Sequence, residues 1–369
     1  MNATSIRNVN VPDVNGLQSR KTLTFATNPG DVLAENAAAD SELDGTGCTM
    51  IAGLIDAKVD THGSTDALDQ FAPRGVTTVM DLSSTTGQGE AMRRAAAESP
   101  GAPSFFFSAT IMGSSHGTPL AIFPFWSMRR VSTRDEAVEY VESTMGGDGG
   151  DGSHLVTVVV DQPGLDSEVL SAVTETAHRH EKLVVGHASQ VAAYRLALET
   201  GCDIIMPLPL DGSLDEETVT AMARRGVGVI PTLSFLRKAM VERRMPQVAY
   251  DHAVAALRTL HRAGVAICAG SSSTSYTGEG GILDYGTGLT EELRLLETDG
   301  GMSRAELLRA ATSTPAALFR LQDRGVLEEG RRADMVLLRG SPLEDAGLID
   351  MNDRILRVWV HGVEVERRV

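Results

Sequence analysis

The sequence predicts an α/β protein: an eight-stranded (β/α)8 TIM barrel with a small β-sandwich lobe built from both chain termini. Three observations support this fold class. A chain of 369 residues is long enough for one barrel and a small additional lobe. Short β-branched and apolar runs alternate with longer helical patterns, which is typical of parallel βα units. The two chain ends depart from this alternation, because they hold short β-like segments separated by Asn, Gly and Pro.

The barrel is expected over residues 51–331, where eight runs have the composition of buried strands. Nearly all of them are separated by a helix, which favours a barrel with its catalytic groups at the carboxyl ends of the strands. The predicted strands are residues 51–56, 76–81, 105–111, 155–161, 183–187, 203–208, 227–232 and 265–270. The predicted helices are residues 88–98, 134–144, 166–180, 190–200, 214–224, 248–262, 289–297 and 304–311.

The small β lobe is expected from residues 1–50 together with residues 332–369. In the second stretch, residues 334–338 and 355–360 have the apolar, β-branched character of strands. We expect the two ends of the chain to pair beside the barrel.

Composition and charge exclude several classes of partner. Asp plus Glu number 49 and Lys plus Arg 33, so the formal net charge is −16, which disfavours nucleic acid and anionic membranes as partners. No apolar run approaches the roughly 20 residues needed to span a bilayer, and the N-terminal stretch lacks the apolar core of a signal peptide. We therefore expect a cytoplasmic protein whose partner is a small-molecule substrate, with a homodimer left open.

The cysteines do not indicate a redox or metal framework. Cys48, Cys202 and Cys268 are far apart and form no CxxC pair. Neither a disulfide framework nor a zinc knuckle is expected from them.

Several motifs occur together along the chain. Residues 51–56 read IAGLID, residues 75–81 read GVTTVMD and residues 184–189 read VVGHAS. Near the end, residues 311–317 read ATSTPAA and residues 325–342 read GVLEEGRRADMVLLRGSP. Over almost its whole length the chain thereby resembles the amidohydrolase superfamily, in its imidazolonepropionase/prolidase-like branch.

The resemblance implies a divalent metal ion, which most of the corresponding residues here are unsuited to hold. Relatives place two histidines two residues apart after the GLID motif, where side chains at i and i+2 of a strand reach one ion. This chain has Lys58 and Asp60 there. The fifth-strand histidine is kept as His187. The other ligand positions of the family, a bridging lysine, a sixth-strand histidine and a catalytic aspartate, correspond to Thr157, Pro207 and Ser272.

These substitutions predict a site that works without metal or other cofactor. Lys58, Asp60 and His187 would form an acid–base site, with Lys58 as proton donor or oxyanion stabiliser and His187 as proton shuttle. Asp161 would orient either partner. The alternative is that Lys58 and Asp60 are a structural ion pair filling the space of a lost ion. Another alternative is a rebuilt metal site of Asp60, His62 and His187.

Further residues are predicted to face a substrate. Residues 113–117 read GSSHG, a formal G-x-S-x-G match with Ser115 at its centre and His116 beside it. We interpret it as a substrate-facing loop, with a serine hydrolase as the minor alternative. Phe123 and Trp126 belong to an aromatic run that predicts a lid over the substrate, packing between loops or a dimer contact. The other predicted substrate-binding residues are His62, Thr157, Ser272 and Tyr285.

Three functions follow from these patterns. The first is a metal-independent enzyme that performs a cyclisation, isomerisation or lyase/dehydration step on a small organic molecule, with specialised metabolite biosynthesis as a plausible setting. The second is an amide or ester hydrolase with a rebuilt metal site or with Ser115 as nucleophile. The third is a non-catalytic barrel that binds a ligand. Fold alone does not decide among them, because one barrel hosts many chemistries.

Overall fold

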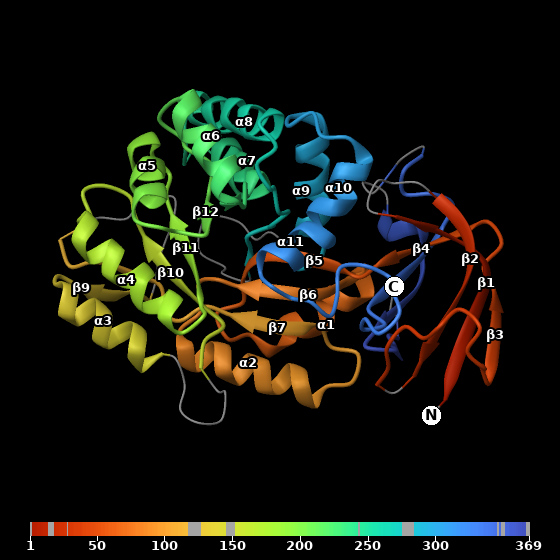
Figure 1. Ribbon diagram of the computed structural model, residues 1–369. Helices are drawn as coiled ribbons and strands as arrows, with labels where there is room; N and C mark the ends of the chain where they lie inside the picture. Colours follow the sequence, from red (N-terminus) through yellow and green to blue (C-terminus); the bar gives the residue numbers. More distant parts are fainter. Residues whose placement is uncertain are drawn as a thin grey trace.

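The structure is a computed structural model that describes residues 2–13, 18–27, 29–116, 127–144, 152–242, 244–274, 284–344, 347 and 351–366. The predicted lid residues Phe123 and Trp126 lie outside the described residues. The described chain is α/β, as predicted, and a β-sheet lobe lies at one end of the molecule (Figure 1). Both ends of the chain lie on this lobe.

Two parallel sheets form the centre of the α/β part. One runs in the order β14-β5-β6-β7 and the other in the order β13-β12-β11-β10-β8-β9. The strands of the first sheet are β5 (Leu54–Asp60), β6 (Val76–Asp81), β7 (Ser104–Phe107) and β14 (Ser273–Thr274). The strands of the second are β8 (Met112–Ser114), β9 (Arg129–Val131), β10 (Leu155–Val159), β11 (Leu183–His187), β12 (Ile204–Met206) and β13 (Gly228–Val229).

Helices surround these strands on the outside (Figure 1). Most of them lie where the helical patterns of the sequence predicted them. They are α2 (Thr86–Glu98), α3 (Arg134–Ser143), α4 (Ser167–Arg179), α5 (Val191–Glu199), α6 (Glu216–Arg225), α7 (Leu233–Val241), α8 (Gln247–Arg262), α9 (Thr287–Thr298), α10 (Arg304–Ala310) and α11 (Ser313–Leu318), with the short α1 (Leu68–Phe71) after β5.

Helix starts follow local capping chemistry in several places. Thr85 and Gln88 form a capping box at the start of α2, each side chain bonding the other's backbone N–H. Asp166 caps α4 by accepting from the backbone N–H of Val169 at 2.9 Å. Such caps explain why these helix starts were predictable from sequence.

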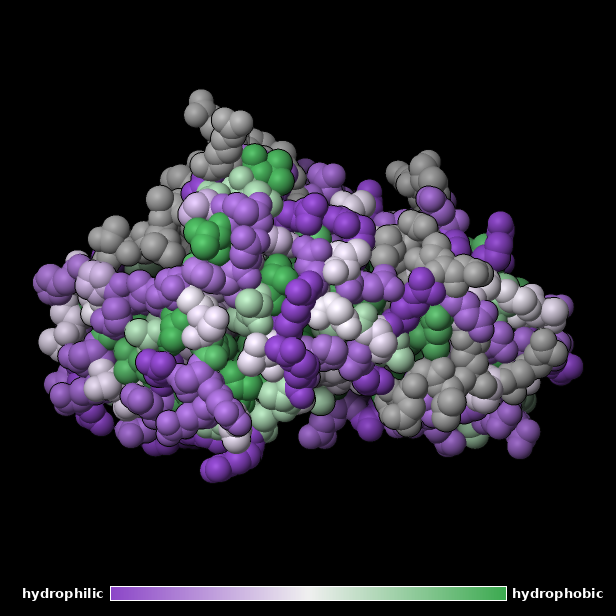
Figure 2. Space-filling model, turned by 90° about the horizontal axis from the view of Figure 1, so that it is seen from above, coloured by the Kyte–Doolittle hydropathy of each residue, from purple (hydrophilic) through white to green (hydrophobic). Residues whose placement is uncertain are grey.

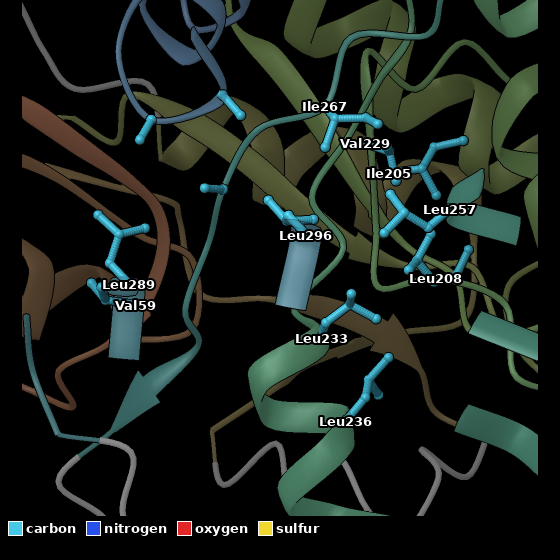
Figure 3. Packing of buried hydrophobic residues seen from close by; sticks show 14 of the residues in the cluster. Val59, Ile205, Leu208, Val229, Leu233, Leu236, Leu257, Ile267, Leu289 and Leu296 are labelled. Atoms are coloured by element: carbon cyan, nitrogen blue, oxygen red, sulfur yellow. The ribbon is translucent and has the colours of Figure 1, made fainter. Parts of the chain in front are cut away.

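Strand and helix layers are joined by a continuous aliphatic core. Figure 3 shows Ile205, Val229 and Ile267, from the sixth, seventh and eighth predicted strands, lying near Leu257 of α8. All four side chains are buried. Removing their apolar surface from water contributes on the order of 2 kcal/mol for each side chain, which fixes the helices against the sheet.

The lobe is a seven-stranded sheet built from both ends of the chain. Its strands are β1 (Ala3–Pro12), β2 (Gln18–Ala26), β3 (Ser41–Asp44), β4 (Cys48–Ala52), β15 (Met335–Arg339), β16 (Ile355–Val360) and β17 (Val363–Glu364). In the described residues they hydrogen-bond as one sheet, rather than as the two sheets of the predicted sandwich. Antiparallel pairing of β4 with β15 joins the two ends, with Ile51 opposite Val336.

The predicted first strand, residues 51–56, is wrong in its bounds. The structure divides it at Gly53, with β4 in the lobe sheet before it and β5 in the central sheet after it. A Cβ at Gly53 would lie 2.1 Å from the Thr77 hydroxyl oxygen, so only glycine lets the chain pass here. The apolar run continues across the division because both strands are buried.

Five other predicted strands are shorter than expected. Of residues 155–161 only Leu155–Val159 is strand, and of residues 203–208 only Ile204–Met206. β7 ends at Phe107, where residues 105–111 were predicted, and only Gly228–Val229 of residues 227–232 is strand. Residues 265–270 pair through a single bridge, from Ile267 to Val229. The helix α7 was not predicted.

The surface is largely polar on the face that Figure 2 shows. Figure 2 shows polar residues over much of the face viewed, with hydrophobic residues in scattered groups. Within the described ranges, none of the helices has the length and apolar character that crossing a membrane requires. The cytoplasmic location and the homodimer stay predictions.

Candidate active site

A buried ion pair lies at the carboxyl end of β5. Lys58 and Asp60 are two residues apart, so their side chains project to the same side of the strand. The Lys58 ammonium bonds Asp60 Oδ2 and lies 3.5 Å from the Ser83 hydroxyl oxygen. Only 9% of the Lys58 side chain and 12% of the Asp60 side chain are exposed. Two predicted catalytic residues therefore contact each other in a nearly dry environment.

The end of the eighth predicted strand completes the surroundings of Asp60. The Ser272 hydroxyl donates to Asp60 Oδ2 at 3.2 Å, and the Ser272 backbone N–H donates to the Lys58 carbonyl at 2.8 Å. The Tyr285 hydroxyl donates to the Asp60 carbonyl at 3.0 Å. Ser272 and Tyr285, both predicted to face a substrate, are thus brought together with the ion pair.

Opposing effects act on the Asp60 carboxyl. Burial by itself raises the pKa of Asp60. The charges of Lys58 and His62, with hydrogen bonds from Lys58 and Ser83, outweigh burial and hold this pKa below its ordinary value. Asp60 is therefore a carboxylate at neutral pH.

A second buried pair joins β10 and β11. His187 Nδ1 lies 3.4 Å from Asp161 Oδ2, and both side chains are almost fully buried. Asp161 also accepts from the Ser189 backbone N–H at 2.6 Å and from the Ser189 hydroxyl at 2.8 Å. This contact of Nδ1 leaves Nε2 as the ring nitrogen turned away from Asp161. The Asp161 carboxylate thus lies within ion-pair distance of the imidazole, while its recorded hydrogen bonds come from Ser189.

The other predicted site residues are placed differently. Thr157 is fully buried in the middle of β10, two residues before Val159, the register partner of His187, and so lies deeper than the strand end. Its hydroxyl has no hydrogen-bond partner among the residues that the structure describes. His62 follows β5, and its backbone carbonyl accepts from the Gln88 amide at 2.9 Å.

The G-x-S-x-G segment is separate from the ion pair in its contacts. Ser115 and His116 are exposed and follow the three-residue strand β8. The Ser115 backbone N–H donates to the Val131 carbonyl at 3.0 Å. Across the described residues, the hydrogen bonds of Lys58 and Asp60 include neither Ser115 nor His116.

Sequence reasoning missed a buried network beneath the ion pair. Asp56 is fully buried and accepts from the Ser271 backbone N–H at 2.9 Å and from its hydroxyl at 2.6 Å. Asp56 Oδ1 also accepts from the Lys58 backbone N–H at 3.3 Å. Burial raises the pKa of Asp56 to about 6, against these hydrogen bonds. Its place in the GLID motif was the only sequence signal for this role.

Glu292 is the second missed acid. It lies on α9, is fully buried, and accepts from the backbone N–H groups of Leu233 at 3.0 Å and Ser234 at 2.7 Å. The Ser234 hydroxyl in turn donates to the Ser271 carbonyl at 2.9 Å. Burial raises the pKa of Glu292 to about 7. A glutamate within an amphipathic helix gave no sequence signal.

Unusual backbone conformations gather at the same strand ends. His62, Thr232 and Ser272 have φ values of 50°, 50° and 53°, in the left-handed region that non-glycine residues rarely adopt. Each of these three residues lies just beyond the carboxyl end of a strand or extended segment of the parallel sheets. Such strain is typical of functional sites, where surrounding contacts hold it in place.

The chain belongs to the amidohydrolase family. The family model described as "Amidohydrolase family" matches residues 38–365, which is most of the chain. This confirms the resemblance predicted from the GLID and closing motifs.

Individual relatives resemble this chain in sequence or in fold. The chain is 27% identical to Aspergillus niger ochratoxinase over 206 residues, which cover 53% of this chain and 40% of that relative. The crystal structure of A. niger ochratoxinase superposes with a TM-score of 0.81 at 18% identity, covering 98% of this chain and 95% of that one. A Xaa-Pro dipeptidase with bound methionine gives a TM-score of 0.77 at 18% identity, covering 99% and 100%. At these identities the structures establish the shared fold.

The residues present do not fit the divalent ion that the family implies. A metal ligand must offer a free electron pair, and a protonated lysine bonded to Asp60 offers a positive charge instead. Pro207, at the sixth-strand position, has no donor side chain. In the described part of the chain, no three His, Cys, Asp or Glu side chains group as a metal site would require, and Asp60, His62 and His187 do not form such a set.

Proposed function

We propose that this protein is a metal-independent enzyme that moves protons on a small organic molecule, with Lys58, Asp60, His187 and Asp161 as its acid–base groups. The buried Lys58–Asp60 ion pair is the observation that carries this proposal. It places a fixed positive charge at the strand end where family members hold an ion. A fixed charge in a dry site stabilises developing negative charge with little reorganisation.

We also propose that the parallel strands close into the eight-stranded barrel predicted from the sequence. Bridges from Ser108 to Leu155 and from Val229 to Ile267 support closure, because they link the two central sheets and the eighth segment. The Ala57 backbone N–H donates to the Ala269 carbonyl at 2.9 Å, which links that segment back to β5. The proposed barrel covers residues 51–331, and the lobe covers residues 1–50 and 332–369.

In the proposed reaction, the His187–Asp161 pair acts as the base, and Lys58 of the other pair stabilises the negative charge that develops on the substrate. His187, oriented by Asp161, removes a proton from the carbon next to a substrate carbonyl. The electron pair of that C–H bond moves into the carbonyl, and the oxygen takes up negative charge facing the Lys58 ammonium. Return of the proton at another carbon gives isomerisation, loss of a β-leaving group gives elimination, and attack on an internal electrophile gives cyclisation.

The residues proposed to bind the substrate are those predicted from the sequence. Ser272 and Tyr285 support the proposal, because they bond Asp60 directly. The others are His62, Thr157, Ser115, His116, Phe123 and Trp126.

Solvent deuterium exchange tests this function without requiring that the substrate be identified. The protein is incubated in D2O with a panel of carbonyl compounds, and mass spectrometry detects a gain of deuterium at an activated carbon. Exchange should survive a chelator and should be lost in Lys58→Met and in His187→Gln. Exchange that disappears with the chelator and returns with zinc would refute metal independence.

Hydrolysis of an amide is the second candidate, because the relatives with named activities are hydrolases. They include ochratoxinase, a Xaa-Pro dipeptidase and molinate hydrolase. Here His187 would take a proton from water as its oxygen attacks the carbonyl carbon, and Lys58 would stabilise the resulting oxyanion. Collapse of this intermediate breaks the C–N bond, and His187 returns the proton to the leaving amine. Reaction in H2 18O separates the two functions, since hydrolysis leaves one 18O in the acid product. Absence of turnover in both assays would favour the non-catalytic alternative.

A further inference from the structure

A cleft lies between the α/β part of the chain and the β-sheet lobe. Its volume is about 580 Å3, which is within the usual range for small-molecule sites. One wall is formed by the end of α2 and the loop that leads into β7. The other wall includes the turn between β16 and β17 of the lobe. Junctions of this kind between two structural units are common places for ligands.

This cleft is at the opposite end of the strands from the ion pair that contains Asp60. Ser104, which begins β7 and lines the cleft, is the register partner of Thr78 in the first half of β6. Asp60 is the last residue of β5, and the preceding Val59 is paired with Asp81, the last residue of β6. A ligand in the cleft would therefore bind apart from the proposed catalytic groups.

The ionisable side chains that line the cleft are all basic, although the formal net charge of the chain is −16. They are Arg93 of α2, Arg332 and His361. His361 Nε2 lies 3.4 Å from Asp31 Oδ1, so this imidazole already has a carboxylate partner. A cleft lined in this way favours an anionic ligand over a cationic one.

Arg332 provides hydrogen-bond donors for such an anion. Its Nε donates to Asp334 Oδ2 at 3.1 Å and lies 3.9 Å from Asp323 Oδ2. Its two terminal NH2 groups have no acceptor among the residues that the structure describes, although only 19% of the side chain is exposed. The Asp334 carboxylate also accepts from the His361 backbone N–H at 2.6 Å, which holds it in place against Nε. A guanidinium fixed at one edge can form two parallel hydrogen bonds with a carboxylate through its other donors.

Much of the remaining lining is apolar. It includes Ala96, Ala102, Pro103, Phe105, Val360 and Val363. Phe105 and Val360 are themselves buried, so they present a fixed surface. Covering such a surface with an apolar group removes both from water, which a small hydrated ion cannot do.

We propose that this cleft is a second binding site, which takes an organic carboxylate with a compact apolar body. The carboxylate accepts hydrogen bonds from the terminal NH2 groups of Arg332. The apolar body packs between Phe105 on one wall and Val360 on the other. The site would join the α/β part to the lobe through its ligand.

Charge and lining together exclude the nearest alternatives. A cationic ligand would be repelled by Arg93 and Arg332. A neutral amide of the same shape loses the charge-assisted hydrogen bonds. Inorganic phosphate or acetate could reach Arg332 but would leave the apolar walls in contact with water.

Three probes test the proposal on the full chain. The dissociation constants of benzoate, benzamide and acetate are measured by ligand-observed NMR titration, with inorganic phosphate as a competitor. We expect saturable binding of benzoate, and binding at least about tenfold weaker for benzamide and for acetate. No saturable binding of benzoate, or equal affinities for benzoate and benzamide, would overturn the proposal. Phosphate that displaces benzoate at concentrations equal to its own would overturn the requirement for an apolar body.

Variants assign the binding to this cleft. Ser99 is an exposed residue that lines the cleft at the end of α2, and Ser99→Glu adds a negative charge there without removing a contact of Arg332. This variant should weaken benzoate binding at least about tenfold, as should Arg332→Met. Ser143→Glu is the matched control at the exposed end of α3, and it should bind benzoate as the wild type does.

Equal benzoate affinity in Ser99→Glu and the wild type would place the binding elsewhere and overturn the assignment. Circular dichroism checks that each variant is folded. The Ser99→Glu comparison decides the matter even if Arg332→Met does not fold, because Arg332 also holds Asp334. This proposal goes beyond the proposed function, since benzoate binding is measured without turnover and deuterium exchange is measured without benzoate.

Discussion

Glu292 Oε2 lies 2.7 Å from the backbone nitrogen of Ser234, so a buried acid of α9 closes the amino end of α7. The residue at the usual capping position, Thr232, has φ 50° and makes no side-chain cap. Glu292 therefore takes over the role of a local cap. The Ser234 hydroxyl donates to the Ser271 carbonyl, so Ser234 connects Glu292 to the segment that holds Ser272.

Replacing Glu292 with Gln should lower the free energy of unfolding by about 1–3 kcal/mol. The amide offers one acceptor oxygen where two backbone N–H groups need acceptors, and its NH2 group would face one of them. Urea unfolding measures the change. Asp166→Asn is the control at another helix start, and it should change stability by less than about 0.5 kcal/mol because Asn caps as well as Asp. Equal losses in both variants would contradict a special role for Glu292.

The stability that Glu292 and Asp56 contribute should fall as pH rises from about 4 to about 7. Burial raises the pKa of Glu292 from 4.5 to about 7 and that of Asp56 from 3.8 to about 6. In this window the folded state holds more protons at these two carboxyls than the unfolded state, so at these groups raising the pH favours unfolding. His154 acts in the opposite direction, because burial lowers its pKa from 6.5 to about 4, so the effect of the carboxyls is measured by comparing variants with the wild type. Each group contributes at most about 1.4 kcal/mol per pH unit. Urea unfolding at pH 5, 6 and 7 measures the slope.

The control for this pH dependence is a carboxyl with the opposite shift. The pKa of Asp215 is lowered to about 2 by hydrogen bonds from Thr218 and Arg195, so this group is ionised throughout the window. Compared with the wild type, Glu292→Gln should make the change of stability with pH between pH 5 and pH 7 more positive, by at most about 1.4 kcal/mol per pH unit, and Asp215→Asn should leave it unchanged. Slopes in Glu292→Gln and Asp56→Asn that equal the wild-type slope would sink the assignment.

The Lys58–Asp60 pair should be more costly to break than to remove. Lys58→Met leaves the Asp60 carboxylate buried without its cation, and stability should fall by about 3–5 kcal/mol. The double variant Lys58→Met with Asp60→Leu removes both charges and should recover most of this loss. Neither variant should catalyse deuterium exchange. Denaturant unfolding of the four members of the cycle gives the coupling energy, and additive losses would show that the two side chains do not interact.

Restoring the family's two histidines should restore sensitivity to metal. Lys58→His with Asp60→His returns two imidazoles at i and i+2, and His187 supplies a third donor. Zinc should raise the thermal midpoint of this double variant and leave the wild type unchanged, because a ligand stabilises only a protein that binds it. Elemental analysis after dialysis checks the binding. A wild-type thermal midpoint that rises with zinc would contradict the conclusion that the residues of this site do not fit a divalent ion.

The sequence was informative where function depends on local spacing. The contact of Lys58 with Asp60 was predicted from their i, i+2 positions, and Asp161 was predicted to lie near a catalytic partner from its place after β10, where the structure has it 3.4 Å from His187. Most helices were predicted because their apolar periodicity is complete within one segment. These features do not depend on residues that are distant in sequence.

Features that depend on distant partners were missed. Asp56 and Ser271 are separated by 215 positions, and Glu292 and Leu233 by 59, so no local pattern relates them. The helix α7 was also missed, and the side chain that holds its start, Glu292, comes from α9. The division of the first strand at Gly53 depends on Thr77, which only the folded sheet brings near.

The antiparallel pairing of Ile51 with Val336 has a consequence for synthesis on the ribosome. β4 emerges early, but its partner β15 emerges only when nearly the whole chain has been made. Until then the edge of β4 offers unpaired N–H and C=O groups to any other extended strand. A nascent chain of this protein therefore needs protection from aggregation at that edge until its last strands arrive.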